Sequence, residues 1–203
     1  GELTAPLANR FCHLPWAVDT GGWVEWATSR SQSHVTIAGY IRNKPQALLN
    51  VPKDESKLGS PWPSPRTWDM SGKLMEANTL HGGSRDNEIM LVSGCIGEGQ
   101  ALEFLNWRNT LDLPDPEVLL AKPQSWKVPE RGDIVFTILA SVTHAAVSKL
   151  TRERYLAAWQ VFNIAANKGK KDVAAGSLSS LITAAAGKQW LNDAELTKEL
   201  KPL

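Results

Sequence analysis

The chain has 203 residues, of which 42% are hydrophobic and 21% charged, so it can bury one good-sized core or two small ones. Its 22 Lys and Arg residues nearly balance 21 Asp and Glu residues, and a net charge of +1 gives no strong field toward nucleic acid or an anionic membrane. The sequence has no apolar signal segment, and Cys12 and Cys95 lack any metal-binding spacing, so we expect reduced thiols in a cytoplasmic protein.

The first 18 residues form an approach to Arg10 followed by a short extended segment. The alternation over residues 11–16 predicts a strand, with Phe11 and His13 on one side. We interpret His13 as a strand residue with an ordinary hydrogen bond rather than as a catalyst, because no nucleophile or second ligand accompanies it.

Residues 19–42 show the spacing of apolar side chains that is typical of helices. Either Asp19 or Thr20 can cap a helix that ends near Ser29. A second helix is expected over residues 34–42, with His34 at its start as a surface or capping residue.

A proline-rich segment separates these helices from the next long one. Pro45 can open a further short helix, and the polar stretch 51–60 predicts a loop. Three alternate prolines then hold residues 61–65 extended, because each fixes its own φ and disfavours helix in the residue before it. Ser64 is a good N-cap and Pro65 suits the first helical position, so a helix is predicted to begin here.

Arg66 lies in the first turn of this helix, where its charge faces the positive end of the helix dipole. This arrangement costs about 0.3 to 1 kcal/mol when exposed, so an anion should compensate for it. On the residues alone we favour a surface ion pair with Asp69, three residues on. The alternative is a ligand phosphate, which a helix N-terminus and a guanidinium both bind.

The same helix continues past Gly72, where we expect a close contact with another helix, since glycine weakens a helix interior by about 1 kcal/mol. A solvated turn with His81 follows, and Asp86 can cap a small apolar helix that ends at Cys95. Segment 94–99 is interpreted as a turn between helices, because it has neither the spacing nor the lysine of a nucleotide-binding loop.

Four further helices are predicted over residues 98–111, 115–121, 134–150 and 151–168. Asp172 can cap the next helix, and a last helix is expected over residues 193–200. Four prolines in residues 113–129 mark a candidate subdomain boundary. Charges close both ends of the apolar helix 134–150, so we expect a buried bundle helix rather than a membrane span, with His144 as a satisfied core histidine. Lys168, Lys170 and Lys171 form a basic turn that we interpret as solvated.

No run of strands exists to build a sheet, so the predicted fold class is all-α. We expect a helical bundle with a C-terminal helical extension and a short N-terminal extended segment. Nine tryptophans against two tyrosines indicate that many of the Trp side chains anchor the core or an interface.

Two short motifs resemble a known family. Ser64-Pro65-Arg66, opening a helix after a proline-rich approach, resembles the second sensor motif of MoxR-type AAA+ ATPases. Pro6-Leu7-Ala8-Asn9-Arg10-Phe11 is similar to the segment that closes the ATPase core of this family, although many relatives have an acidic residue where this chain has Asn9. The motifs occur in family order, and segments 23–27 and 34–42 between them resemble the first lid helices.

The resemblance implies a division into residues 1–18 as the end of the ATPase core, 19–112 as an AAA+ lid-like bundle and 113–203 as a C-terminal extension. It implies that Arg66 is a nucleotide-phosphate sensor and that Arg10 serves as an arginine finger in trans. The full-length protein would then be a ring-forming homo-oligomer that uses ATP and Mg to remodel partner proteins, such as ones with a von Willebrand A type domain.

The chain itself contains no Gly-x-x-x-x-Gly-Lys-Ser/Thr segment and no strand ending in paired acidic residues. We therefore expect the chain alone to be inactive, without a cofactor or metal, and to meet ATP only through a separate core domain. We predict no nucleic-acid partner and no membrane association. The alternative function is a free-standing, all-helical protein-interaction module with no nucleotide role.

Overall fold

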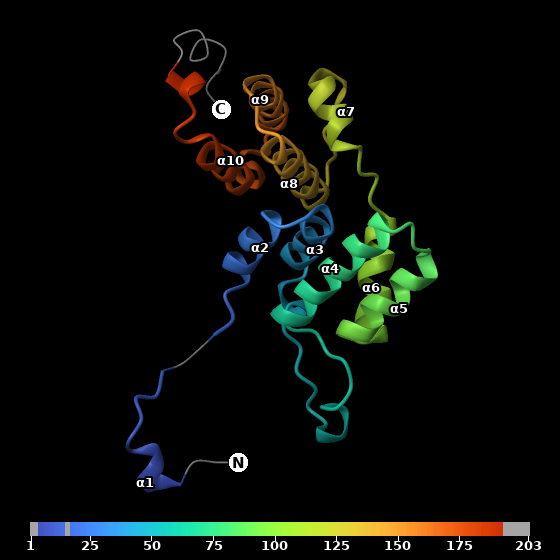
Figure 1. Ribbon diagram of the computed structural model, residues 1–203, viewed down its shortest axis with the longest axis vertical. Helices are drawn as coiled ribbons and strands as arrows, with labels where there is room; N and C mark the ends of the chain where they lie inside the picture. Colours follow the sequence, from blue (N-terminus) through green and yellow to red (C-terminus); the bar gives the residue numbers. More distant parts are fainter. Residues whose placement is uncertain (1–3, 15–16, 193–203) are drawn as a thin grey trace.

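Ten α-helices and four short 3₁₀-helices, with no strand, make up the secondary structure of residues 4–14 and 17–192, the part of the chain that the computed structural model describes (Figure 1). This confirms the predicted all-α fold class. The α-helices are, in chain order, α1 Ala5–Ala8, α2 Thr20–Thr28, α3 Gln32–Asn43, α4 Pro65–Leu80, α5 Arg85–Ile96, α6 Glu98–Asn109, α7 Pro116–Ala121, α8 Gly132–Ser148, α9 Arg152–Asn167 and α10 Lys171–Ala185. The 3₁₀-helices are η1 Pro45–Ala47, η2 Glu55–Lys57, η3 Pro123–Ser125 and η4 Gln189–Asn192.

Helix α8 lies at the centre of the helical body. It packs against α3 on one side and against α7, α9 and α10 on the other (Figure 1). Residues 134–143 are all buried, because apolar side chains occur all round this helix and its buried hydroxyls at Thr137, Ser141 and Thr143 have hydrogen-bond partners. Across the described ranges, no helix combines the length and apolar character needed to span a membrane.

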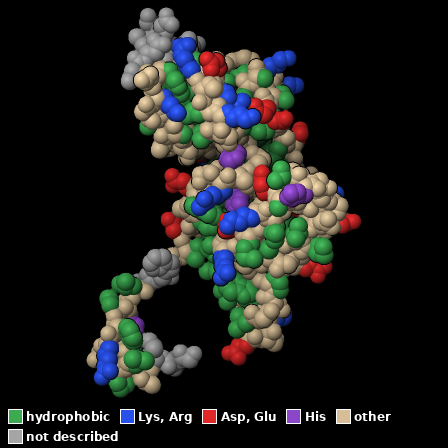
Figure 2. Space-filling view, viewed as in Figure 1, with side chains coloured by type: hydrophobic (Ala, Val, Ile, Leu, Met, Phe, Trp, Pro, Cys, Tyr) green, Lys and Arg blue, Asp and Glu red, His purple; other side chains and the backbone are tan. Residues whose placement is uncertain are grey.

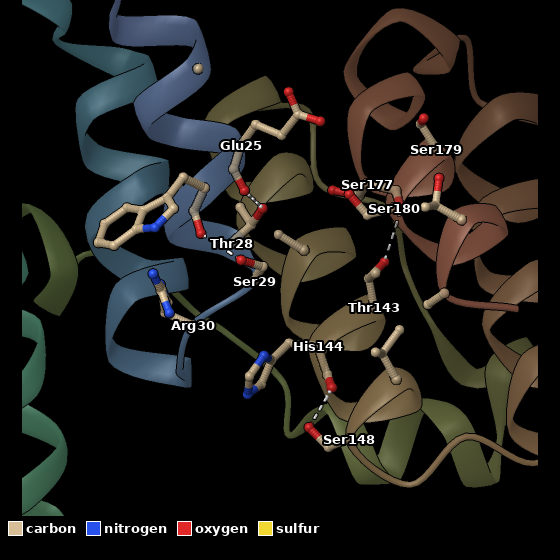
Figure 3. Close-up of a pocket in the computed structure, with 16 residues that line it drawn as sticks. Glu25, Thr28, Ser29, Arg30, Thr143, His144, Ser148, Ser177, Ser179 and Ser180 are labelled. Carbon is tan, nitrogen blue, oxygen red and sulfur yellow. Dashed lines mark hydrogen bonds between the residues drawn. The ribbon is translucent and has the colours of Figure 1, made fainter.

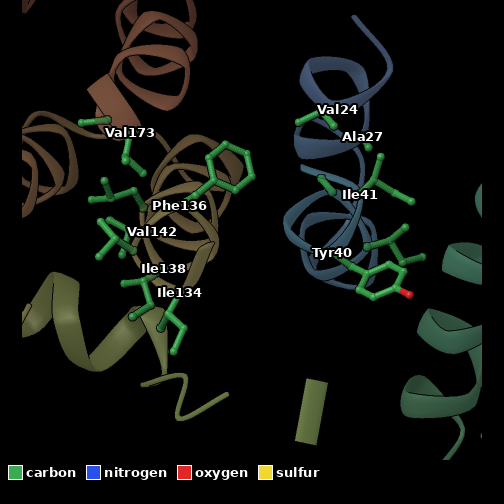
Figure 4. Packing of buried hydrophobic residues seen from close by; sticks show 14 of the residues in the cluster. Val24, Ala27, Tyr40, Ile41, Ile134, Phe136, Ile138, Val142 and Val173 are labelled. Carbon is green, nitrogen blue, oxygen red and sulfur yellow. The ribbon is translucent and has the colours of Figure 1, made fainter. Parts of the chain in front are cut away.

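One buried hydrophobic cluster runs through the body from Val24 in α2 to Ala185 in α10. Figure 4 shows Val24 and Ile41 on α2 and α3, and Ile134 and Phe136 on α8. The cluster continues across residues 113–129 through Leu119, Leu120 and Trp126, so the predicted subdomain boundary carries core residues of its own.

An aromatic group forms the centre of the N-terminal half. Tyr40, Trp68 and Phe104 are fully buried, and their ring centroids lie 5.3 to 5.8 Å apart. The indole Nε1 of Trp68 donates a hydrogen bond of 2.8 Å to the carbonyl of Ala47. Trp68 is therefore one of the predicted Trp anchors, since a buried aromatic ring with a satisfied N–H contributes large apolar area without a polar penalty.

Several helix starts follow from local capping. Of the two candidate caps of α2, Asp19 is the one that caps the helix, by accepting a hydrogen bond of 3.0 Å from the Gly22 N–H. The start of α5 differs from the prediction, because Ser84 rather than Asp86 accepts the Asn87 N–H, at 3.1 Å.

One further deviation lies near the chain's C-terminal end. Helix α10 begins at Lys171, so Asp172 lies in its first turn instead of capping it. The helix predicted over residues 193–200 lies outside the described residues.

The N-terminal segment differs most from the sequence-based expectation. Helix α1 stands apart from the helical body, and residues 11–14 form no strand (Figure 1). A strand needs a neighbouring strand for its hydrogen bonds, and the described part of the chain provides none. His13 instead bonds through Nε2 to the Ala8 carbonyl at 2.7 Å, and Figure 2 shows apolar side chains on this segment, where Phe11 and Leu14 are exposed.

Candidate functional site

The start of α4 is fixed by reciprocal hydrogen bonds. Ser64 Oγ accepts from the Thr67 N–H at 3.2 Å, and Thr67 Oγ1 accepts from the Ser64 N–H at 2.8 Å. The Asn50 N–H donates to the Pro63 carbonyl at 3.1 Å and holds the approach to the helix. The backbone that carries Arg66 is therefore well ordered by its own contacts, while the Arg66 side chain is exposed.

The ion pair between Arg66 and Asp69 that the sequence favours is not formed, so that prediction is wrong. Asp69 accepts hydrogen bonds from Lys73 Nζ at 2.7 Å and from His34 Nε2 at 3.1 Å. An acidic residue before a lysine at the i,i+4 spacing is the better orientation on a helix, and α3 supplies the second donor. Within the described residues, the guanidinium of Arg66 contacts no hydrogen-bond or ion-pair partner.

Arg10 follows directly after α1 and is exposed. Because α1 stands apart from the body in Figure 1, the structure does not bring Arg10 near Arg66. The roles that the resemblance gives these two residues stay predictions.

His34 is buried, with 3% of its surface exposed, so its interpretation as a surface or capping residue is wrong. Its Nδ1 lies 2.9 Å from Ser31 Oγ, and its ring packs edge-on against Trp26 with centroids 6.0 Å apart. The ring fits because Gly72 in α4 has no side chain: a Cβ there would lie 2.6 Å from two ring atoms. This confirms the predicted close contact at Gly72.

The contacts of Asp69 also set its ionisation. Partial burial raises the pKa of the Asp69 carboxyl, but the hydrogen bonds from Lys73 and His34 outweigh it and leave the pKa below its ordinary value. Asp69 is therefore an anion at neutral pH that joins α3 to α4.

Ser31, His34 and Asp69 are the residue types of a hydrolase triad, but their environment does not suit catalysis. Ser31 is the N-cap of α3 and accepts the His34 N–H, and the Ser33 N–H at the same helix start donates to Glu76 at 3.4 Å. A triad needs free N–H donors for the oxyanion and access for a substrate, and here the donors are used and the ring is buried. We therefore interpret Ser31, His34 and Asp69 as a structural contact that joins α3 to α4.

A groove of about 740 Å³ lies between α2 and α10, with α8 as its floor (Figure 3). It continues into a second hollow of about 720 Å³ that reaches Arg42 and Phe136. Glu25, Thr28 and Ser177 line both parts, so we treat them as one surface, the α2–α10 groove. Hydroxyl side chains from all three helices dominate its lining: Thr28, Ser29, Thr143, Ser148, Ser177, Ser179, Ser180 and Thr183.

Two arginines mark the two parts of the groove. The guanidinium carbon of Arg30 lies 4.6 Å from the Trp26 ring centroid, and that of Arg42 lies 4.5 Å from the Phe136 centroid. Neither arginine pairs with a carboxylate of the described ranges. Stacking on an aromatic ring orients a guanidinium without neutralising it, so both positive charges remain available to a ligand.

His144 also lines the groove and is half-buried. Burial lowers the pKa of its imidazole, the positive charge that His34 carries when protonated lowers it further, and Glu76 opposes both, with a net shift below the ordinary value of 6.5. The neutral ring is therefore favoured at physiological pH. The prediction of a satisfied core histidine is wrong, because the ring is only half-buried and forms no hydrogen bond within the described residues.

The basic turn, His81 and the acidic residues of the described chain form no second candidate site. In the basic turn, Lys170 donates from Nζ to the Glu130 carbonyl at 2.9 Å. His81 caps the end of α4 on the surface. No group of three His, Cys, Asp or Glu residues suited to a metal ion occurs in the described part of the chain.

Sequence reasoning missed the α2–α10 groove. The available signal was the set Ser177, Ser179 and Ser180 within one helical turn, because serine is a poor interior helix former and usually has another reason to be there. The positions of Arg30 and Arg42 gave no comparable signal, since their aromatic contacts depend on packing. We found no match to this chain among protein-family models, curated proteins or solved structures.

Proposed function

We propose that this chain is the helical lid and C-terminal part of a MoxR-type AAA+ ATPase, in which Arg66 senses the phosphates of a bound nucleotide. The observation that carries the proposal is the state of Arg66 in the Ser64-Pro65-Arg66 motif. Its guanidinium is exposed at a helix start, and Asp69, the carboxylate three residues on, is held by Lys73 and His34. Within the described part of the chain this position has no anionic partner, and a phosphate would supply one.

The helix that carries Arg66 is suited to reporting on a ligand. Trp68, two residues on, is fully buried and hydrogen-bonded, and the capping box fixes the first turn. The fixed backbone places the guanidinium near one position, so that only the rotamer entropy of the Arg66 side chain is lost when it binds, and its planar fork can hold a phosphate in a bidentate manner. Contact with the phosphate would then bias the orientation of the whole bundle.

The remaining parts of the proposal follow the same resemblance. ATP and Mg would be held by a core domain with its own phosphate-binding loop, and Arg10 would reach the nucleotide of a neighbouring subunit in a homo-oligomeric ring. Remodelling of a partner, such as one with a von Willebrand A type domain, would be the output. The exposed position of Arg10 on a segment apart from the body is compatible with a contact in trans.

The test is ATP hydrolysis by the intact ATPase carrying Arg66→Ala. Turnover should fall, with an unchanged circular dichroism spectrum and melting temperature. Arg85→Ala is the matched control, because Arg85 is also exposed in the first turn of a helix, α5, but lies outside the motif. Equal turnover for the two variants and the wild type would contradict the sensor role.

A second function, a protein-interaction module with no nucleotide role, is favoured by a different observation. The α2–α10 groove is open and lined with hydroxyls, and it carries Arg30 and Arg42, which form no ion pair with any carboxylate in residues 4–14 and 17–192. Arg66→Ala would then leave every measured property of the protein unchanged, whereas substitutions in the groove would weaken partner binding.

A further inference from the structure

We infer that the α2–α10 groove binds an extended segment of another protein, one that carries two acidic side chains separated by neutral residues. The inference does not depend on a nucleotide role for Arg66, since no residue of the groove belongs to α4.

The first support is a buried hydroxyl without a partner. Ser177 is 5% exposed, and its Oγ forms no hydrogen bond with any residue that the structure describes, while the Thr143 hydroxyl donates to the Ser177 carbonyl at 3.4 Å. In Figure 3 the Ser177 side chain points from α10 into the groove, toward α2. A buried polar group without a partner destabilises a fold, and a hydrogen bond from a ligand in the groove would satisfy it.

The second support is the state of the other hydroxyls. Thr28 and Ser29 donate to the carbonyls of Glu25 and Trp26, both at 2.7 Å, and Ser180 donates to the carbonyl of Gly176 at 3.3 Å. A hydroxyl has one hydrogen to donate, so these groups offer only lone pairs to a ligand. Ser179 and Thr183 are exposed and their hydroxyls form no hydrogen bond within the described residues, so they can donate as well as accept. A lining that offers both acceptors and donors matches an extended peptide backbone, which carries N–H donors and carbonyl acceptors in turn.

The shape of the groove agrees with a peptide rather than an enclosed small molecule. Its two parts are joined end to end, and residues along its rim are exposed: Glu25, Ser29, Arg30, Arg42, Ser179 and Thr183. A strand-like segment can therefore lie along the groove and leave at both ends.

The charges specify the side chains of the segment. Arg30 lines only the first part of the groove and Arg42 only the second, so an acidic side chain at each end of the segment would meet a guanidinium. Glu25 lines both parts and disfavours a further acidic residue at the middle. This gives an acidic–neutral–acidic pattern.

The experiment measures fluorescence anisotropy of labelled peptides with the 203-residue chain. The probes are peptides in which alanine spacers of increasing length separate two glutamates, each matched with a peptide that has glutamine instead. At least one spacer length should bind, the glutamine peptides should bind more weakly, and added salt should reduce the difference. No binding by any glutamate peptide, or equal binding of the matched pairs, would overturn the inference.

Variants locate the site on the protein. Arg30→Gln and Arg42→Gln should each weaken binding by about threefold, and the double variant by about tenfold, since exposed ion pairs contribute modestly and distant sites add. Glu25→Gln should strengthen binding. Arg85→Gln, which removes an exposed arginine of α5 outside the groove, should have no effect. A loss with Arg85→Gln as large as that with the groove variants would contradict the assignment.

Ser177→Ala separates a binding role from a purely structural one. The variant should melt at a higher temperature, because it removes an unpartnered buried hydroxyl and adds a better helix former, yet bind the peptide more weakly. Unchanged peptide affinity would show that Ser177 does not face the ligand. Full displacement of the peptide by inorganic phosphate alone would identify a small-anion site and overturn the peptide assignment.

Discussion

The ring of His34 fills the space that a side chain at Gly72 would need, so that α3 and α4 meet with an imidazole against a bare backbone. A Cβ at Gly72 would lie 2.6 Å from both Cε1 and Nε2 of His34, which is closer than carbon and nitrogen atoms approach without bonding. The hydrogen bonds of His34 to Ser31 and Asp69 hold the ring in place on both sides.

Gly72→Ala should therefore destabilise the protein by about 1 to 2 kcal/mol, since overpacking in a filled core outweighs the better helix propensity of alanine. Gly94→Ala in α5 is the control, because a Cβ there meets nothing within 4 Å. It should stabilise by about 0.5 to 1 kcal/mol. Urea unfolding monitored by circular dichroism measures both, and a stabilised Gly72→Ala variant would show that His34 can move aside.

The contact between α5 and α6 gives a second prediction. Arg108 donates to both carboxylate oxygens of Glu88 at 2.6 Å, and both side chains are largely screened from solvent. Arg108→Lys should cost about 1 kcal/mol, because lysine cannot form the paired bonds. Arg131→Lys should cost less, since Arg131 is about half exposed where it pairs with Asp133. Equal losses in thermal stability would contradict this ranking.

His144 predicts a pH dependence of stability. Its pKa is lowered in the folded state below its ordinary value of 6.5, so the unfolded chain binds the proton more readily. The contribution of the neutral His144 ring to the free energy of unfolding is therefore full above pH 6.5. It is lost as the pH falls from 6.5 toward the pKa of the folded state. His144→Gln should flatten this part of the stability profile in urea titrations, and an unchanged slope would show that His144 does not titrate in this way.

Predictions from the sequence succeeded where the interacting residues are neighbours in the chain and failed where they belong to different helices. The start of α4 could be predicted from Ser64 and Pro65 because a cap and its helix are neighbours in sequence. The burial of His34 could not be predicted from the sequence, because it depends on the space at Gly72 in another helix. The lack of a partner for Arg66 within the described residues has two origins, because its expected partner Asp69 is bound both by Lys73 of the same helix and by His34 from α3. The Lys73 spacing is local and could be read from the sequence, whereas the His34 contact could not. The strand predicted over residues 11–16 is not formed over 11–14, the part of it that the structure describes, because alternation indicates a strand only where a partner strand exists.

The isolated chain should be folded and without ATPase activity. Its large apolar side chains, including the fully buried Trp68, Phe104 and Phe162, each contribute about 1.5 to 3 kcal/mol when buried. Hydrolysis also requires phosphates and magnesium held in line with a water, and the sequence has no segment of the kind that holds them. Circular dichroism should show a cooperative helical melt, and calorimetry should show no tight ATP binding. Magnesium-dependent hydrolysis that Arg66→Ala abolishes would contradict this division of roles.

The central claim is that Arg66 recognises nucleotide phosphate, and the affinity ratio of ATP to AMP in the intact ATPase tests it most directly. A charge-assisted contact to the terminal phosphates should make the Arg66→Ala variant bind ATP about tenfold more weakly while its affinity for AMP stays the same. Arg85→Ala should leave both affinities unchanged. An ATP-to-AMP ratio in Arg66→Ala equal to that of the wild type would contradict the claim.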